Sequence, residues 1–352
     1  MSTFDGQQVS RRRFVQAATG TGIAGLAGCV GGLTGGGGGE APLSVAYMPI
    51  YPDMQHFVMD QQGYYDELPV PVEAELFSDG PSIVQAYAKG DYDVALFGVV
   101  PAMIIADKTG FAKVTGANIE EAMLIMASDE FAGLYEEHGG DAFAKFEQEK
   151  GRKFTFGTFP PGSVPDILLR YWLDSELGLD PESDVNIKSL GGAGPVRQAL
   201  VAGKIDGTSI MEPVPTIVQS KGAGYQNIAW AGDFMSGQPA AVTMMHDRLR
   251  NDRPGLAKDF LRQHRKATEF IDANPGKAAE DAATVIGEDV LPVDIARQAM
   301  ESKGANFISN PHRIESGAKI FAEYAARLGK TEQELGVSDI FDYSLYDEVA
   351  NE

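Results

Sequence analysis

Two copies of one sequence pattern, about 113 residues apart, constrain the fold more than any other feature of the chain. In the first copy, residues 72–94, a short strand-like segment leads through Gly80-Pro81 into a helical segment, a turn and another apolar run. Residues 185–207 repeat this order, with Gly194-Pro195 before the helical segment. Pro in the first helical turn and Gly at the helix end are the expected punctuation. Strand–helix–strand alternation with buried strands is typical of a parallel α/β sheet, so the chain is expected to form two similar α/β lobes.

The same reading gives expected elements and boundaries for the whole chain. Strands are expected at 43–48, 70–77 and 94–97, with strands at 122–126 leaving the first lobe and at 241–245 returning to it. Helices are expected at 53–62, 81–89, 254–272, 275–286, 292–303 and 311–328. The expected organisation is a leader at 1–28, a Gly-rich tether at 29–41, lobe I at 42–125 and 241–330, lobe II at 126–240, and an acidic tail at 331–352 with Phe341, Tyr343 and Tyr346 as docking residues.

The charge of the chain excludes two classes of partner. Fifty acidic residues stand against 29 Lys and Arg, which gives a net charge of −21. Such a surface repels nucleic acid and anionic lipid, so neither is expected to bind. The same excess of acid keeps a protein soluble in very high salt. We interpret it as a halophilic signature, with ordinary acidic solubility as the alternative.

The N-terminus carries the features of an export signal. Ser10-Arg11-Arg12-Arg13-Phe14-Val15 resembles a twin-arginine motif, and an uncharged stretch too short to span a bilayer follows it. Leu26-Ala27-Gly28-Cys29 resembles a lipobox, in which the cysteine is acylated after cleavage. Cys29 is the only cysteine, and a glycine-rich tether follows it. The mature protein, with a net charge of about −23, is expected to be anchored to the outer face of a membrane by a lipid.

Motifs for catalysis and for metal binding are missing from the sequence. It contains no C-x-x-C, no H-E-x-x-H and no G-x-S-x-G, and its five histidines lack metal-ligand spacing. The glycines at 192–194 are interpreted as a tight turn into a helix rather than a nucleotide loop. Asp91 and Asp93 are interpreted as a solvated turn rather than an acid pair or a metal site. No catalytic residue, cofactor or metal is therefore expected.

The candidate binding residues lie where strands end, because open α/β sheets bind ligands beyond the carboxyl ends of their strands. The predicted ligand-binding residues are Tyr47, Tyr51, Gln55, Ser78, Asp79, Gly98, Val99, Thr158, Ser163, Gly192 and Glu212. Ser163 opens a helix, with Asp166 at capping-box spacing, and a helix N-terminus suits an anionic oxygen. Two alternatives stay open: Ser163 only caps its helix, and Tyr47 and Tyr51 belong to the core.

Glu212 is the most informative single residue of this set. It follows the apolar Ile210-Met211 and precedes Pro213, so it is expected at a strand end that faces the space between the lobes. Its carboxylate could accept a hydrogen bond from a ligand, pair with Arg197 or hold the hinge. Few cations besides Arg197 and His56 accompany the candidate set. A neutral, zwitterionic or cationic ligand therefore stays open beside an anion.

Several segments together resemble the substrate-binding proteins of ABC importers in the nitrate, sulfonate, taurine and thiamine-precursor group. The segments that carry the resemblance are Gln62–Asp66, Ala88–Ala95, Gly157–Ser163, Gly178–Pro181, Ala199–Gly207 and Met211–Pro213, within coverage of residues 43–330. The resemblance implies a two-lobed periplasmic-binding-protein fold of type II, with parallel-dominated sheets and a two-strand hinge. It also implies a monomeric, non-enzymatic solute-binding protein that delivers a small solute to an ABC permease and its ATPase. A thiamine-pyrimidine-precursor binding protein, an enzyme of the same fold and a ligand-sensing ectodomain are the alternatives.

Overall fold

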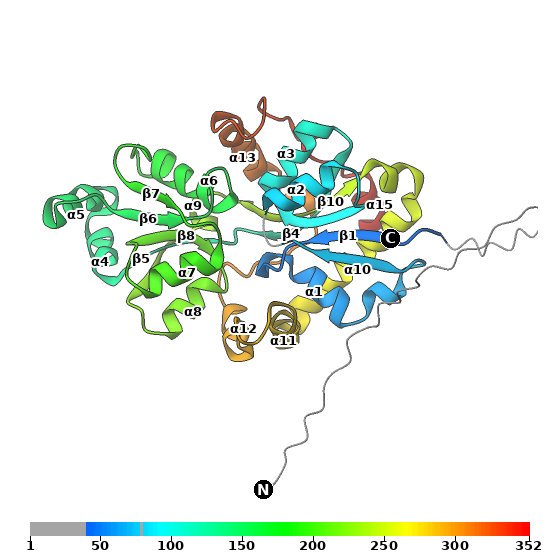
Figure 1. Ribbon diagram of the computed structural model, residues 1–352, viewed down its shortest axis with the longest axis horizontal. Coiled ribbons are helices and arrows are strands. Elements are labelled where there is room, and N and C mark those ends of the chain that lie inside the picture. The colour runs from blue at the N-terminus through cyan, green and yellow to red at the C-terminus, as the bar shows by residue number, and fades with distance from the viewer. Residues whose placement is uncertain (1–39, 78–79) are drawn as a thin grey trace, which may run out of the picture. The chain divides into compact units, whose positions relative to one another are not determined.

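The computed structural model describes residues 40–77 and 80–352, and within them the chain forms two α/β lobes (Figure 1). Ser78, Asp79, Cys29 and the expected leader lie outside the described residues. The sheet of lobe I has the strand order β2 (Val72–Leu76), β1 (Leu43–Tyr47), β3 (Val94–Gly98), β10 (Pro239–His246), β4 (Ala112–Glu120). The sheet of lobe II has the order β7 (Asn186–Ser189), β6 (Thr155–Thr158), β8 (Gly207–Met211), β5 (Met123–Ser128), β9 (Tyr225–Trp230).

Each sheet has one strand that runs against the others. β10 is antiparallel to both β3 and β4, while β1 is parallel to β2 and β3. In lobe II, β5 is antiparallel to both β8 and β9, while β6 is parallel to β7 and β8. Four of the five strands in each sheet therefore share one direction, as expected for parallel-dominated sheets, and the reversed strand is the one that follows a connection from the other lobe.

Helices flank both sheets. Those of lobe I are α1 (Met54–Gln61), α2 (Gly80–Ala88), α3 (Val99–Thr109), α10 (Pro254–Ala273), α11 (Pro275–Ile286), α12 (Val293–Ala299), α13 (Glu315–Arg327), α14 (Val337–Ile340) and α15 (Ser344–Ala350). Those of lobe II are α4 (Asp129–His138), α5 (Ala142–Lys150), α6 (Val164–Tyr171), α7 (Ala193–Val201), α8 (Val214–Ser220) and α9 (Ala231–Phe234). Short 3-10 segments are η1 (Tyr51–Asp53), η2 (Tyr64–Glu67), η3 (Gly139–Asp141) and η6 (Pro311–Ile314), and π-helical turns are η4 (Trp172–Glu176) and η5 (Arg248–Asp252).

The repeated pattern of the sequence is repeated in space. β2, α2 and β3 in lobe I correspond to β7, α7 and β8 in lobe II. In each sheet another strand lies between the two repeated strands: β1 lies between β2 and β3, and β6 lies between β7 and β8. Pro195 is the third residue of α7 rather than the first, but an N–H at that position also has no partner within the helix, so proline is tolerated there.

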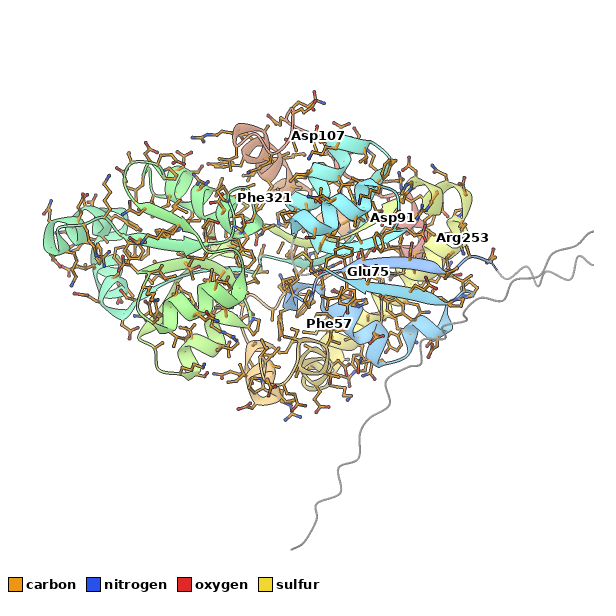
Figure 2. All side chains as sticks on the ribbon, in the orientation of Figure 1. Phe57, Glu75, Asp91, Asp107, Arg253 and Phe321 are labelled. Atoms are coloured by element: carbon orange, nitrogen blue, oxygen red, sulfur yellow. The ribbon has the colours of Figure 1, made fainter. Side chains whose placement is uncertain are left out.

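The turns at the end of each copy are held by equivalent aspartates. Asp93 accepts a hydrogen bond from the N–H of Ser44 at 3.0 Å, and Asp206 accepts one from the N–H of Thr155 at 2.8 Å. Each carboxylate also pairs with an arginine, Arg248 in lobe I and Arg152 in lobe II. The equivalent residues are therefore structural, while Asp91 stays in an exposed turn (Figure 2).

Two connections join the lobes, and each is a single short crossing. Residues 121–122 link β4 to β5, and residues 231–238 link β9 to β10 through α9. The segment expected to leave lobe I, 122–126, is thus mainly β5 of lobe II, and the returning segment, 241–245, lies within β10 of lobe I.

Two hydrophobic clusters form the described core. One extends from lobe I, including Phe57 and Phe321, across to α6 and α8 of lobe II (Figure 2). The second lies within lobe II and is mainly aromatic, with Phe131, Phe154 and Trp172 among its members. Gly207 makes this packing possible: a Cβ there would lie 2.5 Å from the carbonyl oxygen of Met126 and 2.9 Å from the ring of Phe154.

The acidic tail packs on lobe I. Phe341 forms a β-bridge with Val114 on the edge strand β4, and the N–H of Asp342 donates to the carbonyl of Val114 at 3.0 Å. Phe341 and Tyr346 are buried, while Tyr343 is partly buried. The C-terminal segment therefore covers an edge that would otherwise expose unpaired backbone groups.

Candidate functional site

The β6–α6 loop of lobe II carries two buried hydroxyls that have no hydrogen-bond partner. Thr158 ends β6 and is fully buried, and its Oγ1 has no partner among the described residues. Ser163 is the N-cap of α6 with an extended backbone, yet its side chain makes no capping hydrogen bond, and its Oγ is also buried without a partner. Since a buried hydroxyl ordinarily has a partner, these two groups keep an unused hydrogen-bonding capacity at the end of β6 and at the start of α6.

The capping box expected at Ser163 is not formed. The Asp166 carboxylate accepts from the N–H of Gly162 at 2.8 Å, one residue before the position that a capping box requires. Arg170 Nε donates to the same oxygen at 3.0 Å, because the two side chains are one helical turn apart. Burial raises the pKa of Asp166, and the hydrogen bond from Gly162 and the charge of Arg170 oppose this shift. Asp166 thus shapes the loop and leaves the Ser163 hydroxyl free.

The first turns of α3 and α6 meet at the boundary between the lobes. Gly98 is the N-cap of α3, and Val99, the first residue of that helix, is fully buried. A Cβ at Gly98 would lie 3.6 Å from Cγ2 of Val164, the first residue of α6. Helix N-termini offer unpaired N–H groups and a partial positive charge. The predicted residues Gly98, Val99 and Ser163 are therefore brought together, from different lobes, in an arrangement that favours ligand oxygens.

Tyr51 of lobe I and Glu212 of lobe II are a second pair of predicted residues, and both are buried. Glu212 follows β8 and is 3 % exposed; its Oε2 accepts from the N–H of Thr216 at 3.2 Å, and its carboxylate also bonds to the Ser302 side chain. Burial raises the pKa of Glu212. Tyr51 is buried in lobe I and donates to the carbonyl of Ala296 at 3.2 Å. Burial raises the pKa of Tyr51, and the charge of Glu212 adds to this shift.

Arg197 and His56, the two possible cations that the sequence predicts near the site, do not provide a free positive charge there. Arg197 does not pair with Glu212; its Nη1 donates to the carbonyl of Val290 at 3.2 Å. Burial lowers the pKa of His56 to about 3, so its imidazole is neutral. Its ring lies 3.8 Å from that of the partly exposed Tyr47, centroid to centroid, and its Nδ1 shares a hydrogen bond of 2.6 Å with the Tyr65 hydroxyl. His56 therefore supports Tyr47 as an aromatic surface.

The remaining predicted residues lie apart from these two groups. Gln55 is fully buried in lobe I, and its Nε2 donates to the carbonyls of Asn118 at 2.7 Å and Ile308 at 3.1 Å. Gly192 is the N-cap of α7, and a Cβ there would have no neighbour within 4 Å. The structure places neither residue beside Ser163 or Glu212.

Sequence reasoning missed the residues that come from the C-terminal third of the chain. Ser302 contacts Glu212, the carbonyl of Ala296 accepts from Tyr51, and Lys330 lies against the β6–α6 loop. No local motif marks these positions, since their roles arise only from the folding of distant segments onto the boundary.

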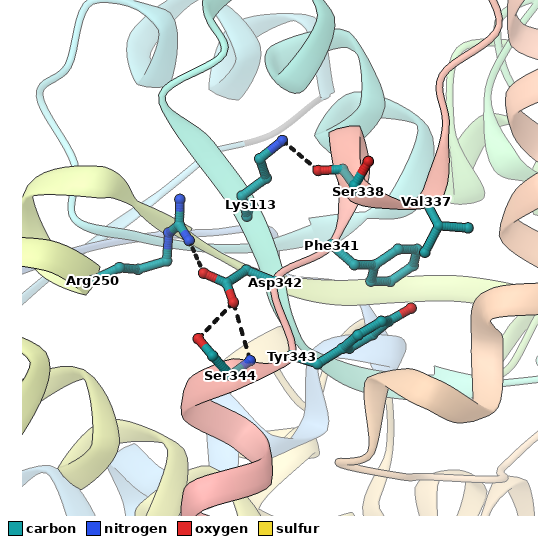
Figure 3. A pocket seen from close by; sticks show the side chains of 8 residues that line it. All are labelled: Lys113, Arg250, Val337, Ser338, Phe341, Asp342, Tyr343 and Ser344. Carbon is teal, nitrogen blue, oxygen red and sulfur yellow. Dashed lines mark hydrogen bonds and ion pairs between the residues drawn. The ribbon is translucent and has the colours of Figure 1, made fainter.

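The described part of the chain contains a separate surface hollow of about 740 Å³ beside the C-terminal segment (Figure 3). It is lined by Lys113, Arg250, Val337, Ser338, Phe341, Asp342, Tyr343 and Ser344. Arg250 pairs with Asp342 and Asp247, and Lys113 donates to the carbonyls of Ser338 and Asp339. Its cations are engaged, and none of the predicted ligand-binding residues lines it.

The described residues contain neither a candidate metal cluster nor a candidate membrane-spanning helix. No group of three or more His, Cys, Asp or Glu side chains there is placed to hold a metal ion. None of the helices between residues 40 and 352 has the length and apolar character needed to cross a membrane.

Known structures share this architecture. The nitrate-binding protein NrtA from Synechocystis PCC 6803 superposes with a TM-score of 0.71 at 14 % identity, covering 88 % of both chains. The aliphatic sulphonate binding protein SsuA from Escherichia coli gives 0.70 at 14 % identity, covering 88 % of this chain and 99 % of that one. The ligand-binding component of an ABC-type import system from Staphylococcus aureus, with zinc bound, gives 0.70 at 17 % identity, covering 89 % and 100 %. The fold is thus the two-lobed periplasmic-binding-protein fold expected from the sequence.

Sequence relatives match over shorter stretches. The nitrate import ATP-binding protein NrtC of Synechocystis is 31 % identical over 132 residues, which are 38 % of this chain and 19 % of that protein. The bicarbonate transport ATP-binding protein CmpC of the same organism is 37 % identical over 92 residues, 26 % of this chain and 13 % of that protein. The matches thus span at most about a fifth of either relative. The model of the NMT1-like family matches residues 36–287, most of the chain, and the protein belongs to that family.

Proposed function

We propose that the protein is the extracytoplasmic solute-binding subunit of an ABC importer, which captures a small nitrate-, sulfonate- or taurine-like solute between its lobes. The observation that carries this proposal is the meeting of the α3 and α6 N-termini beside the free hydroxyls of Thr158 and Ser163. Such a site holds solute oxygens through N–H and O–H donors. It requires no cation from a side chain.

Tyr51 and Glu212 give the proposed site a second end, which suits a different part of the solute than the helix N-termini do. Glu212 and Tyr51 present a carboxylate and a phenol at the boundary, and a carboxylate favours a ligand that carries a donor or a positive charge. A solute with an oxyanion at one end and an amine at the other, such as taurine, satisfies both ends. Bare nitrate uses only the first end.

Named neighbours support binding rather than catalysis. NrtA and SsuA are described as nitrate- and sulphonate-binding proteins, and the matched relatives NrtC and CmpC are described as import and transport ATP-binding proteins. Since one fold can host several functions, the fold alone does not exclude an enzyme. Recovery of a bound solute unchanged after long incubation would distinguish binding from turnover.

We also propose where the protein acts and with which partners. The protein is exported by the twin-arginine route, acylated at Cys29 and held as a monomer on the outer face of the membrane, where it passes solute to a permease driven by an ATPase. The sequence motifs at residues 10–15 and 26–29 support this, with the Gly-rich tether giving reach. Residues 126–240 act as lobe II and the flanking segments as lobe I.

A thermal-shift screen tests the proposal, followed by calorimetry on any solute that raises the melting temperature. The panel is nitrate, bicarbonate, taurine, alkanesulfonates and thiamine-pyrimidine precursors, in high salt. Binding by the wild type and loss of binding in Ser163→Ala support the lobe boundary as the site. Binding of a solute that is equally tight in Ser163→Ala, Thr158→Val and Glu212→Ala would refute it.

A further inference from the structure

Helix α13 belongs to lobe I, but its C-terminal end reaches lobe II (Figure 1). The helix packs on α3 and β10 of lobe I, and on α6 of lobe II. From its last turns, the Tyr324 hydroxyl donates to Oδ2 of Asp174 at 3.1 Å, and Arg327 Nη1 donates to the same oxygen at 2.9 Å. Ser175 Oγ lies 3.4 Å from the Tyr324 hydroxyl. Asp174 and Ser175 belong to η4, the π-helical turn that continues α6.

Lys330 extends this contact to the loop that carries the free hydroxyls. Its side chain lies over Gly162, so closely that a Cβ at residue 162 would be 2.7 Å from Cδ of Lys330. Gly162 has φ +83°, a conformation that glycine adopts without cost. Glycine at this position therefore serves two purposes: it forms the turn and it admits the lysine from the other lobe.

Asp166 links the lysine to the hydroxyl loop. Its carboxylate holds the N–H of Gly162, and the charge of Lys330 stabilises the ionised form of the same carboxylate. The first contact is within lobe II and the second crosses between the lobes. Arg327 thus pairs with an aspartate of lobe II, while Lys330 covers the loop that Asp166 holds.

The net charges of the lobes oppose closure. Residues 126–240 contain 16 acidic and 9 basic residues, a net charge of −7. Residues 40–125 and 241–352 contain 33 acidic and 17 basic residues, a net charge of −16. Two bodies of the same sign repel each other, and salt screens the repulsion. In a protein with two acidic lobes, ion pairs at the boundary are therefore needed to offset the repulsion between the lobes.

The other flank of the boundary is built differently. There Arg197 donates to the uncharged carbonyl of Val290, and Lys303 lies 5.2 Å from the centre of the Trp230 ring. Neither contact pairs a cation with a carboxylate. The charge-paired flank is the one that contains α6 and its hydroxyl loop.

We infer that Tyr324, Arg327 and Lys330 form an electrostatic clasp that closes the lobes against their mutual repulsion and positions the β6–α6 loop. The three are positioning residues, because they contact Gly162 and Asp174 rather than a solute. An exposed ion pair shifts an equilibrium only a few-fold, so the clasp acts as a set. Its effect on solute affinity rests on the proposed function, whereas its effect on the lobes does not.

The test measures the distance between the lobes without any solute. Spin labels are placed at exposed positions of the two lobes, Gln85→Cys on α2 and Glu147→Cys on α5, in a Cys29→Ser background of the full chain. Arg327→Gln with Lys330→Met removes both charges and keeps most of the side-chain volume. Lys319→Met is the matched control, since Lys319 is on the same helix and pairs with Glu315 there at 2.9 Å.

We expect the Arg327→Gln/Lys330→Met protein to gain about tenfold in the ratio of long to short label distances at constant salt, and the Lys319→Met protein to keep the wild-type distribution. Gly162→Ala, which displaces Lys330 without removing a charge, should shift the distribution in the same direction. A double variant with the wild-type distribution would overturn the clasp. Failure of the wild type to bind any solute of the panel would instead contradict the proposed function and leave the distance result standing.

Discussion

The N–H of Glu121 donates to the carbonyl oxygen of Gln238 at 2.7 Å, so the two connections between the lobes are hydrogen-bonded to each other. Glu121 holds the joint in two further ways: its Oε1 accepts from the N–H of Gly237 at 2.9 Å, and its carbonyl accepts from Trp230 Nε1 at 2.7 Å. It is also the only non-glycine residue with positive φ, +53°, among the described residues. One glutamate thus combines an unfavourable backbone conformation with three bonds at the hinge.

Substitution of Glu121 separates these contributions. Glu121→Ala keeps the positive φ and loses the bond to Gly237, and should lower the free energy of unfolding by about 1–2 kcal/mol. Glu121→Gly loses the same bond but relieves about 1–2 kcal/mol of left-handed backbone strain, which exceeds the roughly 0.4–1 kcal/mol that the unfolded-state entropy of glycine costs, so it should be the more stable of the two variants. Denaturant unfolding of the three proteins in one buffer measures the order. An alanine variant as stable as the glycine variant would contradict a strained hinge.

The free hydroxyls should matter for binding and not for folding. Ser163→Ala and Thr158→Val remove groups that have no partner within the described chain, so their melting temperatures should stay within the error of the wild type or rise. The affinity for the solute identified in the screen should fall by about 1–3 kcal/mol for each variant, and equally for Glu212→Ala. Calorimetry and thermal unfolding on the same samples measure both quantities.

Two control variants should lose stability without losing affinity for the solute. Ser128 is an N-cap whose Oγ accepts from the N–H of Phe131 at 3.4 Å, so Ser128→Ala should cost about 1 kcal/mol of stability and leave affinity unchanged. Asp206→Ala removes the acceptor of Thr155 and the partner of Arg152, at the amino ends of the strands, and should destabilise without weakening binding. If the controls lose affinity while Ser163→Ala does not, the site lies at the other end of the sheet.

Glu212 predicts a pH dependence of stability. Burial raises its pKa above the ordinary value near 4.5, so the folded state binds the proton more tightly than the unfolded state. The resulting stabilisation is complete below the unfolded pKa and is lost as the pH rises through the folded pKa. Glu212→Gln removes this contribution. The difference in unfolding free energy, wild type minus variant, should therefore decrease as the pH is raised from 4.5, and a difference that is constant with pH would refute the shift.

The repeated pattern predicted the lobes because it is local. Each copy of strand, Gly-Pro, helix and turn folds from neighbouring residues, and the turn aspartates Asp93 and Asp206 occupy equivalent places. The reversed strands β10 and β5 did not follow from the repeat, since their pairing joins residues at least 80 positions apart in the sequence. The sequence reading of a fold with two crossings was still confirmed by the topology and by the superpositions.

The site was less predictable for a physical reason. Gln55 has the residue type and position of a ligand contact, but its amide is taken up by carbonyls of Asn118 and Ile308, and Ile308 lies 253 residues away. The same distance effect hides Ser302 and Lys330, which reach the boundary only after the C-terminal helices dock. Strand ends can be read from a sequence, whereas the partners that distant segments bring to them cannot.

The proposed lipid anchor yields a prediction that is independent of the site. Cys29 is the only cysteine in the chain and stands directly after a lipobox-like Leu26-Ala27-Gly28. Since acylation needs this thiol, Cys29→Ser should move the protein from the membrane fraction to the soluble fraction. Arg11→Lys with Arg12→Lys should instead retain the precursor in the cell. A Cys29→Ser protein that stays with the membrane would contradict the anchor.

The last prediction concerns salt and follows from the charge of the whole protein. Without residues 1–28, the proposed leader, the chain carries about −23, and the described residues include exposed ion pairs such as Lys266–Glu67 and Lys277–Glu280. At 0.01 M salt the Debye length is about 30 Å, so carboxylates repel each other over the whole lobe. The melting temperature should therefore rise steadily between 0.05 M and 3 M KCl. Sorbitol at matched water activity is the control, because it does not screen charge, and it should give a smaller rise. A melting temperature that is the same across the KCl series would contradict the halophilic interpretation, since self-repulsion of this size cannot be insensitive to screening.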